Sequence, residues 1–165
     1  QDSLGHQAVI RAMPNTPAQI GQGVSVWTAS PQVTEEKRQM AQAILQALGV
    51  EVYVAEEKYI DMATALSASG PAYVFLFIEA LIDAGVHLGL PRDTSRTLAV
   101  QTVLGSTLLV KESGQHPAQL RDMVTSPGGT TVEALQVLEH GRLRATLVNA
   151  VIAAYEKARR LGGEK

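Results

Sequence analysis

Short apolar segments rich in β-branched residues occupy the first third of the chain. Three of them are typical of strands, because apolar and polar positions alternate or β-branched residues cluster there: 8–12, 24–28 and 51–55. Between the second and third segments, Thr34 followed by two glutamates predicts a helix that ends before Gly49. A strand, a helix and a strand of this length indicate a βαβ unit with parallel pairing. Such a unit is too small to be a domain, so we interpret it as the end of a larger sheet that begins before this chain.

From about Glu56 onward the pattern is helical throughout, which makes the chain mainly α. Proline or a small polar residue precedes most of the apolar periodic segments, and glycine follows several of them. The predicted helices are 71–88, 91–114, 117–125, 130–141 and 142–161.

The helix that begins at Pro71 is apolar on every face, because residues 73–78 are consecutive large apolar residues. A helix of this kind is buried in the folded protein. A bundle of only five helices can hardly enclose it, so we expect a second copy of the chain to cover it in an intertwined homodimer. The alternative is a compact monomer with two exposed apolar stripes.

Composition excludes several classes of function. Apolar residues make up 45% of the chain and charged residues 18%, with a net charge of −2, so no basic footprint for nucleic acid or for an anionic membrane is present. Cysteine is absent and the four histidines lack metal-ligand spacing, so we expect no metal site. The longest apolar run, 72–78, is far short of the roughly 20 residues of a membrane span. Because 1–7 is polar and resembles no signal peptide, a cytoplasmic location is the expectation.

The segment 126–131, Ser-Pro-Gly-Gly-Thr-Thr, is the most informative candidate for chemistry. Thr130 and Glu133 fit a capping box, and the two glycines before them let the backbone approach a ligand closely. Free N–H groups at the start of the following helix could then bind a small carboxylate. The alternative is a helix–turn–helix corner that needs glycine only for its turn.

Two further segments are predicted as loops of the ligand-binding kind. In 13–17, which follows the first strand, Pro14 and Pro17 flank two polar residues, and a rigid turn is the alternative there; the segment 66–71 precedes a helix. No nucleophile–base arrangement accompanies them. Three such loops without an acid–base catalyst suggest that a cofactor carries the chemistry, as in hydride transfer.

These segments resemble one family. Five stretches match, in order, the motifs of the pyrroline-5-carboxylate reductases: 11–17, 66–73, 89–91, 115–122 and 126–131. The resemblance extends over essentially the whole chain, which corresponds to the C-terminal half to two-thirds of such an enzyme. It implies the C-terminal part of a Rossmann-type nucleotide-binding domain over 1–56 and an all-helical dimerisation and substrate-binding domain over 57–165.

The resemblance also implies a reaction and its residues. The family reduces 1-pyrroline-5-carboxylate to L-proline with NADPH or NADH, as homodimers that can form rings of dimers. Carried over, the substrate carboxylate is held by Ser126, Gly128, Gly129, Thr130 and Thr131. Thr131 is the catalytic candidate, because it would bond the ring nitrogen. Residues expected to border the cofactor are Met13, Asn15, Ser67, Ser69 and Gly70.

The chain departs from the family pattern in one respect. The Gly-x-Gly-x-x-Gly phosphate loop is absent, and the residues after 21–23 do not fit it. We therefore expect a partial enzyme that is inactive in isolation. A non-catalytic dimerisation or proline-binding module derived from such a reductase is the alternative. A β-hydroxyacid dehydrogenase, which uses a lysine in its helical domain, fits less well, because the lysines beyond Lys58 lie near helix ends.

Overall fold

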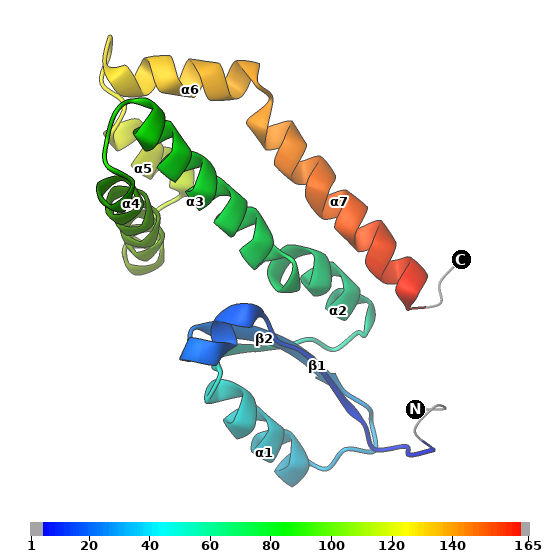
Figure 1. Ribbon diagram of the computed structural model, residues 1–165. Helices are drawn as coiled ribbons and strands as arrows, with labels where there is room; N and C mark the ends of the chain where they lie inside the picture. The colour runs from blue at the N-terminus through cyan, green and yellow to red at the C-terminus, as the bar shows by residue number, and fades with distance from the viewer. Residues whose placement is uncertain (1–4, 163–165) are drawn as a thin grey trace. The chain divides into compact units, whose positions relative to one another are not determined.

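A computed structural model describes residues 5–162 and begins with a three-stranded sheet (Figure 1). Its strands are β1 (Ile10–Met13), β2 (Gly23–Ala29) and β3 (Gly49–Tyr53), in the order β1-β2-β3. β1 and β2 pair antiparallel, whereas β2 and β3 pair parallel. The helix α1 (Glu35–Gln46) connects β2 to β3 along the chain. The predicted βαβ unit with a parallel pairing is therefore confirmed.

The helix α1 begins where the sequence predicts. Thr34 caps it by accepting a hydrogen bond from the Lys37 amide at 3.4 Å, and two glutamates follow in the first turn. On the sheet face that α1 covers, Glu51 accepts from Trp27 Nε1 at 2.5 Å and from Gln42 Nε2 at 2.7 Å. Trp27 is only 4% exposed. A polar network thus fixes α1 and β3 around a buried indole.

A second helix, α2 (Lys58–Ala63), covers the opposite face of the sheet. Its Ile60 is fully buried, and Arg11 of β1 forms ion pairs with Asp61 of this helix and with Glu57, its N-cap residue. Figure 1 shows α1 and α2 on opposite sides of the strands. The strands of this part therefore lie between two helices, which is how an α/β sheet buries both faces.

The helix α2 continues through a π-helical turn, Thr64–Ala68, into α3 (Gly70–His87). The Ser69 amide donates to the Thr64 carbonyl at 2.9 Å, the i→i+5 bond that defines the wide turn. The prediction of a loop over 66–71 is thus wrong. Pro71 lies in the first turn of α3, where a missing N–H costs no helical hydrogen bond, so it does not interrupt the chain's helical path.

By length and composition, the stretch Lys58–His87 is apolar enough to cross a membrane. Its 30 residues include a window of mean hydropathy 1.6, of which 6% is buried within one chain. The helical stretch is longer than the apolar run 72–78, because α2 and the π-helical turn precede α3. Length and composition alone do not separate a membrane span from a core helix of a soluble protein.

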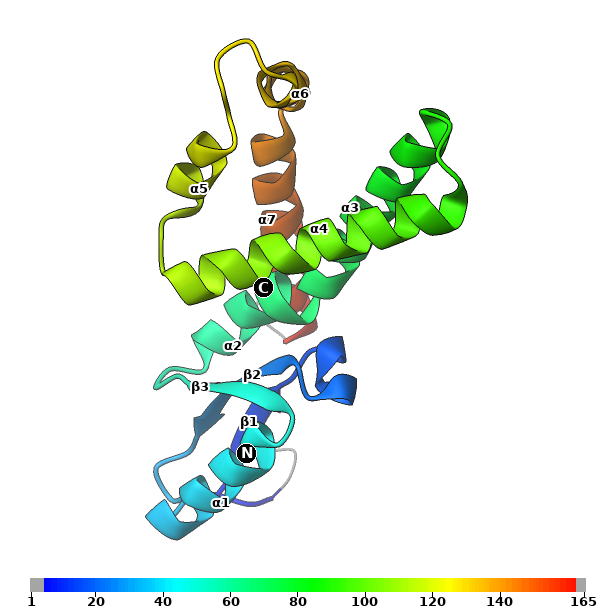
Figure 2. The ribbon, with the colours of Figure 1, turned by 90° about the vertical axis from the view of Figure 1, so that its left-hand side faces the viewer.

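The chain divides into two compact units. One comprises the residues up to Tyr73 together with those from Asn149 onward, and the other is Val74–Val148. The second unit contains most of α3, together with α4 (Arg92–Ser113), α5 (Pro117–Met123), α6 (Thr130–His140) and the start of α7 (Leu143–Leu161), which Figure 2 shows. All five predicted helices are confirmed to within one or two residues at each end.

A tight turn joins α3 to α4 in the second unit. Ser95, which is 2% exposed, donates from Oγ to the Ile82 carbonyl at 2.6 Å. A Cβ on Gly85 would clash with the Ser95 side chain, so the two helices meet here only because residue 85 is glycine. Arg92 and Asp83 add an ion pair at 3.0 Å near the same turn.

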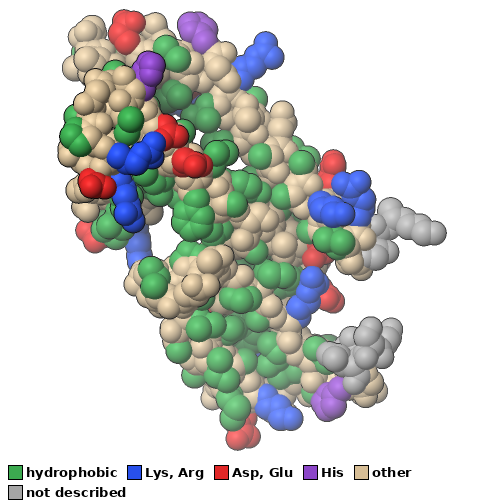
Figure 3. All heavy atoms as spheres, in the orientation of Figure 1, with side chains coloured by type: hydrophobic (Ala, Val, Ile, Leu, Met, Phe, Trp, Pro, Cys, Tyr) green, Lys and Arg blue, Asp and Glu red, His purple; other side chains and the backbone are tan. Residues whose placement is uncertain are grey.

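Away from this turn, the second unit leaves its apolar side chains uncovered. Among residues 74–148, all of which are described, only Ser95 and Ala99 are buried. The exposed fraction is 58% for Phe75 and 67% for Leu76. Figure 3 shows hydrophobic side chains at the molecular surface. The all-round apolar helix that the sequence predicts to need a second copy is indeed not enclosed by this chain.

Candidate functional site

The loop before α6 is a glycine-dependent turn. The Gly129 amide donates to the Ser126 carbonyl at 3.0 Å, and Gly128 has φ +69°, a left-handed conformation that favours glycine. A Cβ on Gly129 would lie 2.6 Å from Ser126 Oγ and 3.1 Å from the Ser126 carbonyl oxygen. Both glycines are therefore required by the turn itself, the first for its conformation and the second for a close approach.

The helix α6 begins differently from the prediction. Gly129 is the N-cap residue, in an extended conformation, and no side chain caps the helix. The predicted capping box of Thr130 and Glu133 is therefore wrong, because Thr130 already lies inside the first turn of the helix. The sequence pattern placed the cap one residue too late.

This uncapped start leaves hydrogen-bond donors available. The Val132 amide donates to the Gly129 carbonyl at 3.1 Å. Within residues 5–162, the amides of Thr130 and Thr131 donate to no protein acceptor, and neither threonine hydroxyl forms a hydrogen bond. Thr130 is exposed and Thr131 is half-buried. Two free N–H groups at the positive end of an eleven-residue helix can bind a carboxylate.

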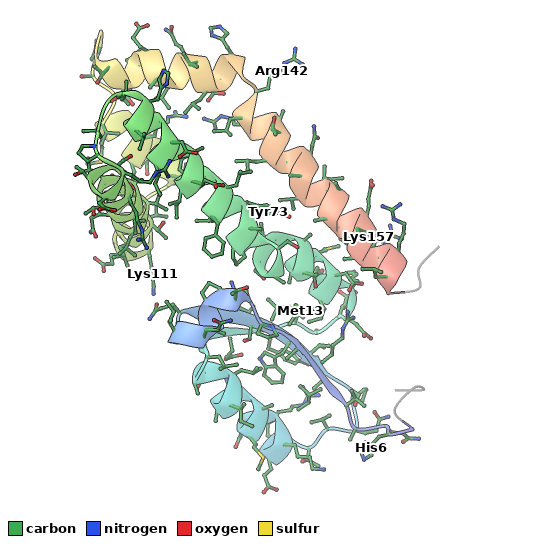
Figure 4. The ribbon with its side chains drawn as sticks, in the orientation of Figure 1. His6, Met13, Tyr73, Lys111, Arg142 and Lys157 are labelled. Carbon is green, nitrogen blue, oxygen red and sulfur yellow. The ribbon has the colours of Figure 1, made fainter. Side chains whose placement is uncertain are left out.

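The segment after β1 is shorter than the predicted loop. Thr16–Ile20 forms a 3-10 helix with Pro17 in its first turn and the extended Asn15 as its N-cap residue. The Asn15 side-chain oxygen accepts from the Val24 amide at 2.9 Å, which ties the segment to β2. Figure 4 labels Met13 at the end of β1. Met13 is therefore the last residue of β1, and Asn15 lies in a connection that is tied to β2 rather than in a loose loop.

The glycines that follow this 3-10 helix do not form a phosphate cradle. The Gln22 amide donates to the Pro17 carbonyl at 3.1 Å, and a Cβ on Gly23 would lie 2.7 Å from Ala18. Residues 21–23 therefore close the 3-10 helix and contact its backbone.

Three side chains brace the π-helical turn. Thr64 Oγ1 donates to the Ile60 carbonyl at 2.8 Å, Ser67 Oγ to the Ala63 carbonyl at 2.9 Å, and Tyr73 Oη to the Ala65 carbonyl at 3.2 Å. Figure 4 labels Tyr73 in the first turns of α3. π-Helical turns occur frequently at functional sites. Ser67, Ser69 and Gly70 of this region are predicted cofactor residues, whereas no local pattern in the sequence indicates the hydrogen bond from Tyr73.

The predicted site residues fall into two groups. Met13, Asn15, Ser67, Ser69 and Gly70 belong to the first compact unit, and 126–131 belongs to the second. Within residues 5–162, no group of three or more His, Asp or Glu side chains could hold a metal ion. Arg11, the only arginine next to the first predicted loop, was not among the predicted site residues.

Two surface hollows lie elsewhere. One, of about 400 Å³, lies between α5 and α6 and is lined by Arg121, Thr125 and Glu139 among others. The other, of about 460 Å³, lies beside β1 and β2 and includes Arg11, Ser30 and Glu57. None of the ten predicted site residues lines either hollow.

The fold and these loops define a class: the end of a Rossmann-type sheet followed by an all-helical dimerisation region. Residues 57–161 match the family model for pyrroline-5-carboxylate reductase dimerisation. This chain belongs to the pyrroline-5-carboxylate reductase family.

Individual relatives agree with that assignment. The pyrroline-5-carboxylate reductase of Glycine max is 51% identical over 161 residues, which is 98% of this chain and 58% of the relative. The crystal structure of Plasmodium falciparum pyrroline carboxylate reductase with NADP bound superposes with a TM-score of 0.91 at 41% identity, covering 96% of this chain and 60% of that one. The Coxiella burnetii pyrroline-5-carboxylate reductase gives 0.90 at 42% identity, over 97% and 60%. The chain thus spans about three-fifths of the length of its relatives.

Proposed function

We propose that this chain is part of an enzyme that reduces 1-pyrroline-5-carboxylate to L-proline with NADPH or NADH. The observation that carries the proposal is the pair of free amides at Thr130 and Thr131, at the start of α6 and directly after a turn that requires both of its glycines. The substrate's carboxylate is the kind of group that such a helix start binds. The NADP bound to the Plasmodium falciparum relative supports the class of cofactor.

We assign residues 1–56 to the C-terminal part of the nucleotide-binding domain and 57–165 to the helical dimerisation and substrate-binding domain. Met13 and Asn15 would border the cofactor from the end of β1. Ser67, Ser69 and Gly70 would do so from the π-helical turn and the start of α3. The rigid connections around both segments support this role, because a positioned ligand needs fixed neighbours.

In the proposed mechanism, the carboxylate of the imine lies on the amides of Thr130 and Thr131. Thr131 Oγ1, which has no protein partner among the described residues, would bond the ring nitrogen and orient the iminium for attack at its carbon. A reduced nicotinamide, when bound, supplies the hydride. Alignment of two reactants can contribute about 7–11 kcal/mol, so these residues act by placing the substrate rather than by acid–base chemistry.

We further propose that the helical part associates as an intertwined homodimer, which can assemble into a ring of dimers. The exposed apolar side chains of α3 and α4 support the dimer. Burial of Lys58–His87 by a second copy would also account for its high hydropathy without a membrane. We place the protein in the cytoplasm, with no nucleic-acid partner.

The test is substitution of Thr131 in the full-length enzyme. Thr131→Ala and Thr131→Val should each lower kcat by about 10- to 100-fold, because a hydrogen bond to a charged group contributes about 1.5–3 kcal/mol. Thr131→Ser, which keeps the hydroxyl, is the matched control and should retain most of the turnover. Full turnover in both the Ala and Val variants would refute the role of Thr131.

A further inference from the structure

The guanidinium of Arg11 in β1 binds two carboxylates, one in α2 and one at the N-cap of that helix. Its Nη1 donates to Glu57 Oε1 at 3.0 Å, and its Nη2 donates to Asp61 Oδ1 at 2.9 Å. The two acids are four residues apart and so lie on the same face of the helix. This contact joins segments that are 46 and 50 residues apart in the sequence.

The two ion pairs are not equivalent. The Asp61 side chain is 17% exposed and that of Arg11 37%, whereas the Glu57 side chain is 70% exposed. Exposed pairs contribute little, so the bond to Asp61 is the one that matters. Burial lowers the pKa of Arg11, but the hydrogen bonds and charges of Asp61 and Glu57 raise it more, to above its ordinary value. The guanidinium therefore stays charged.

Arg11 and Asp61 each lie close in the chain to residues proposed to border the cofactor. On one side, Arg11 precedes Met13 by two positions, and Asn15 is tied to β2 by its bond from the Val24 amide. On the other side, Asp61 lies one turn before the π-helical turn, whose start is braced by Thr64 Oγ1 on the Ile60 carbonyl. Along the chain, Arg11 is two residues from Met13, and Asp61 is three residues from the start of the π-helical turn at Thr64.

We propose that Arg11 is a positioning residue, whose fork on Asp61 and Glu57 fixes the segment at Met13–Asn15 against the π-helical turn so that both meet the nicotinamide end of the dinucleotide. This inference rests on the proposed function. Only arginine presents two parallel donors in a rigid fork; a lysine ammonium can approach both acids only as a point charge. The guanidinium of Arg11 therefore fixes the distance between β1 and the start of α2, in addition to neutralising the two carboxylates.

The test compares variants of the full-length enzyme by steady-state kinetics. Arg11→Met should raise KM for the dinucleotide about tenfold, with less than about a twofold change in KM for the imine, since tenfold corresponds to roughly 1.4 kcal/mol. Asp61→Asn should act in the same direction, and the double variant should be no worse than Arg11→Met alone. Arg11→Lys should give an intermediate KM.

The control removes an exposed ion pair from the same helix. Lys58 Nζ lies 2.6 Å from Glu56 Oε2, and the two side chains are 53% and 57% exposed. Lys58→Met should leave both KM values unchanged. If Arg11→Met does not fold, Arg11→Lys decides: a wild-type KM for the dinucleotide overturns the proposal.

Two other outcomes separate this proposal from the one on which it rests. A lower melting temperature in Arg11→Met with unchanged KM values would make Arg11 merely structural and would overturn the positioning role. That result together with impaired Thr131→Ala would leave the proposed reductase function intact. A wild-type full-length enzyme that does not reduce 1-pyrroline-5-carboxylate with either dinucleotide would instead count against the function itself.

Discussion

The two compact units of this chain bury apolar side chains to very different extents. In the first, Trp27 is 4% exposed and Ile60 is fully buried, because helices cover both faces of the sheet. In the second, Phe75 and Leu76 are 58% and 67% exposed, and burial is limited to Ser95 and Ala99 at a close helix crossing. One unit completes a core within a single chain, and the other does not.

The difference follows from the pattern of side chains. Strands with alternating side chains need only one helix on each face, and α1 and α2 supply both. A helix that is apolar on all sides needs neighbours all round, and one hairpin with α4 supplies them on one side only. A large exposed apolar surface of this kind marks an interface. The match of residues 57–161 to the dimerisation family model supports self-association of the helical part.

The largest expected effect comes from placing charge on that surface. The double substitution Phe75→Asp and Leu76→Asp should weaken dimer formation by at least about a hundredfold, because each buried large apolar side chain contributes about 1.5–3 kcal/mol. Sedimentation equilibrium over a range of protein concentrations measures the change.

A matched control tests whether any exposed apolar residue gives the same result. Ile44 of α1 is 61% exposed, about as much as Phe75, but it lies in the first unit. Ile44→Asp should leave the dimer intact. Equal dissociation in both variants would contradict the assignment of the interface to α3.

A cavity in the first unit should have the next largest effect. Ile60→Ala removes a side chain with no exposed surface and should cost about 2–5 kcal/mol of unfolding free energy. Because Ile60 packs within its own chain, this loss should be the same at low and high protein concentration in chemical denaturation. A loss that disappears on concentrating the protein would place Ile60 in an interface instead.

A smaller effect is expected at the helix crossing of the second unit. Gly85→Ala would place a Cβ 3.1 Å from Ser95 Cβ and in closer contact with Ser95 Oγ, at a cost of about 1–3 kcal/mol. Adding Ser95→Ala should restore part of that loss, because it removes the nearer atom. Thermal unfolding of the wild type, the Gly85→Ala variant and the double variant measures both steps, and a Gly85→Ala variant as stable as wild type would exclude the close approach.

The smallest effect concerns acid stability. Hydrogen bonds from Trp27 and then Gln42 lower the pKa of Glu51, against a smaller opposing effect of burial. A lowered pKa contributes stability above the ordinary glutamate value, and this stability is lost as pH falls through the folded-state pKa. Glu51→Gln should therefore flatten the decline in unfolding free energy between about pH 5 and pH 3. An unchanged decline would mean that Glu51 contributes nothing to it.

Local signals in the sequence predicted most of the fold. Thr34, Pro91 and Pro117 mark helix starts that the structure confirms to within one residue, because capping groups and proline act on their own neighbours. The alternating segment at 51–55 and the helix before it correctly indicated parallel pairing. The all-round apolar run at 73–78 correctly indicated a surface that one chain does not cover.

Other features depended on contacts that a local pattern does not contain. The cap of α6 shifted to Gly129 because the turn at Ser126 already fixes that residue in an extended conformation. Within the π-helical turn, the Ala65 carbonyl accepts a hydrogen bond from Tyr73, eight residues further along the chain. The Arg11–Asp61 pair joins a strand to a helix 50 residues away. The roles of the ten predicted site residues remain predictions.

The most direct test of this account is the mass of the 165-residue chain in solution, measured by light scattering after size-exclusion chromatography. One chain has a mass of 17.6 kDa. We expect a particle of twice that mass, or a multiple of it, with no significant population of single chains at micromolar concentration. A folded, monodisperse particle of 17.6 kDa would contradict the claim that the helical part needs a second copy.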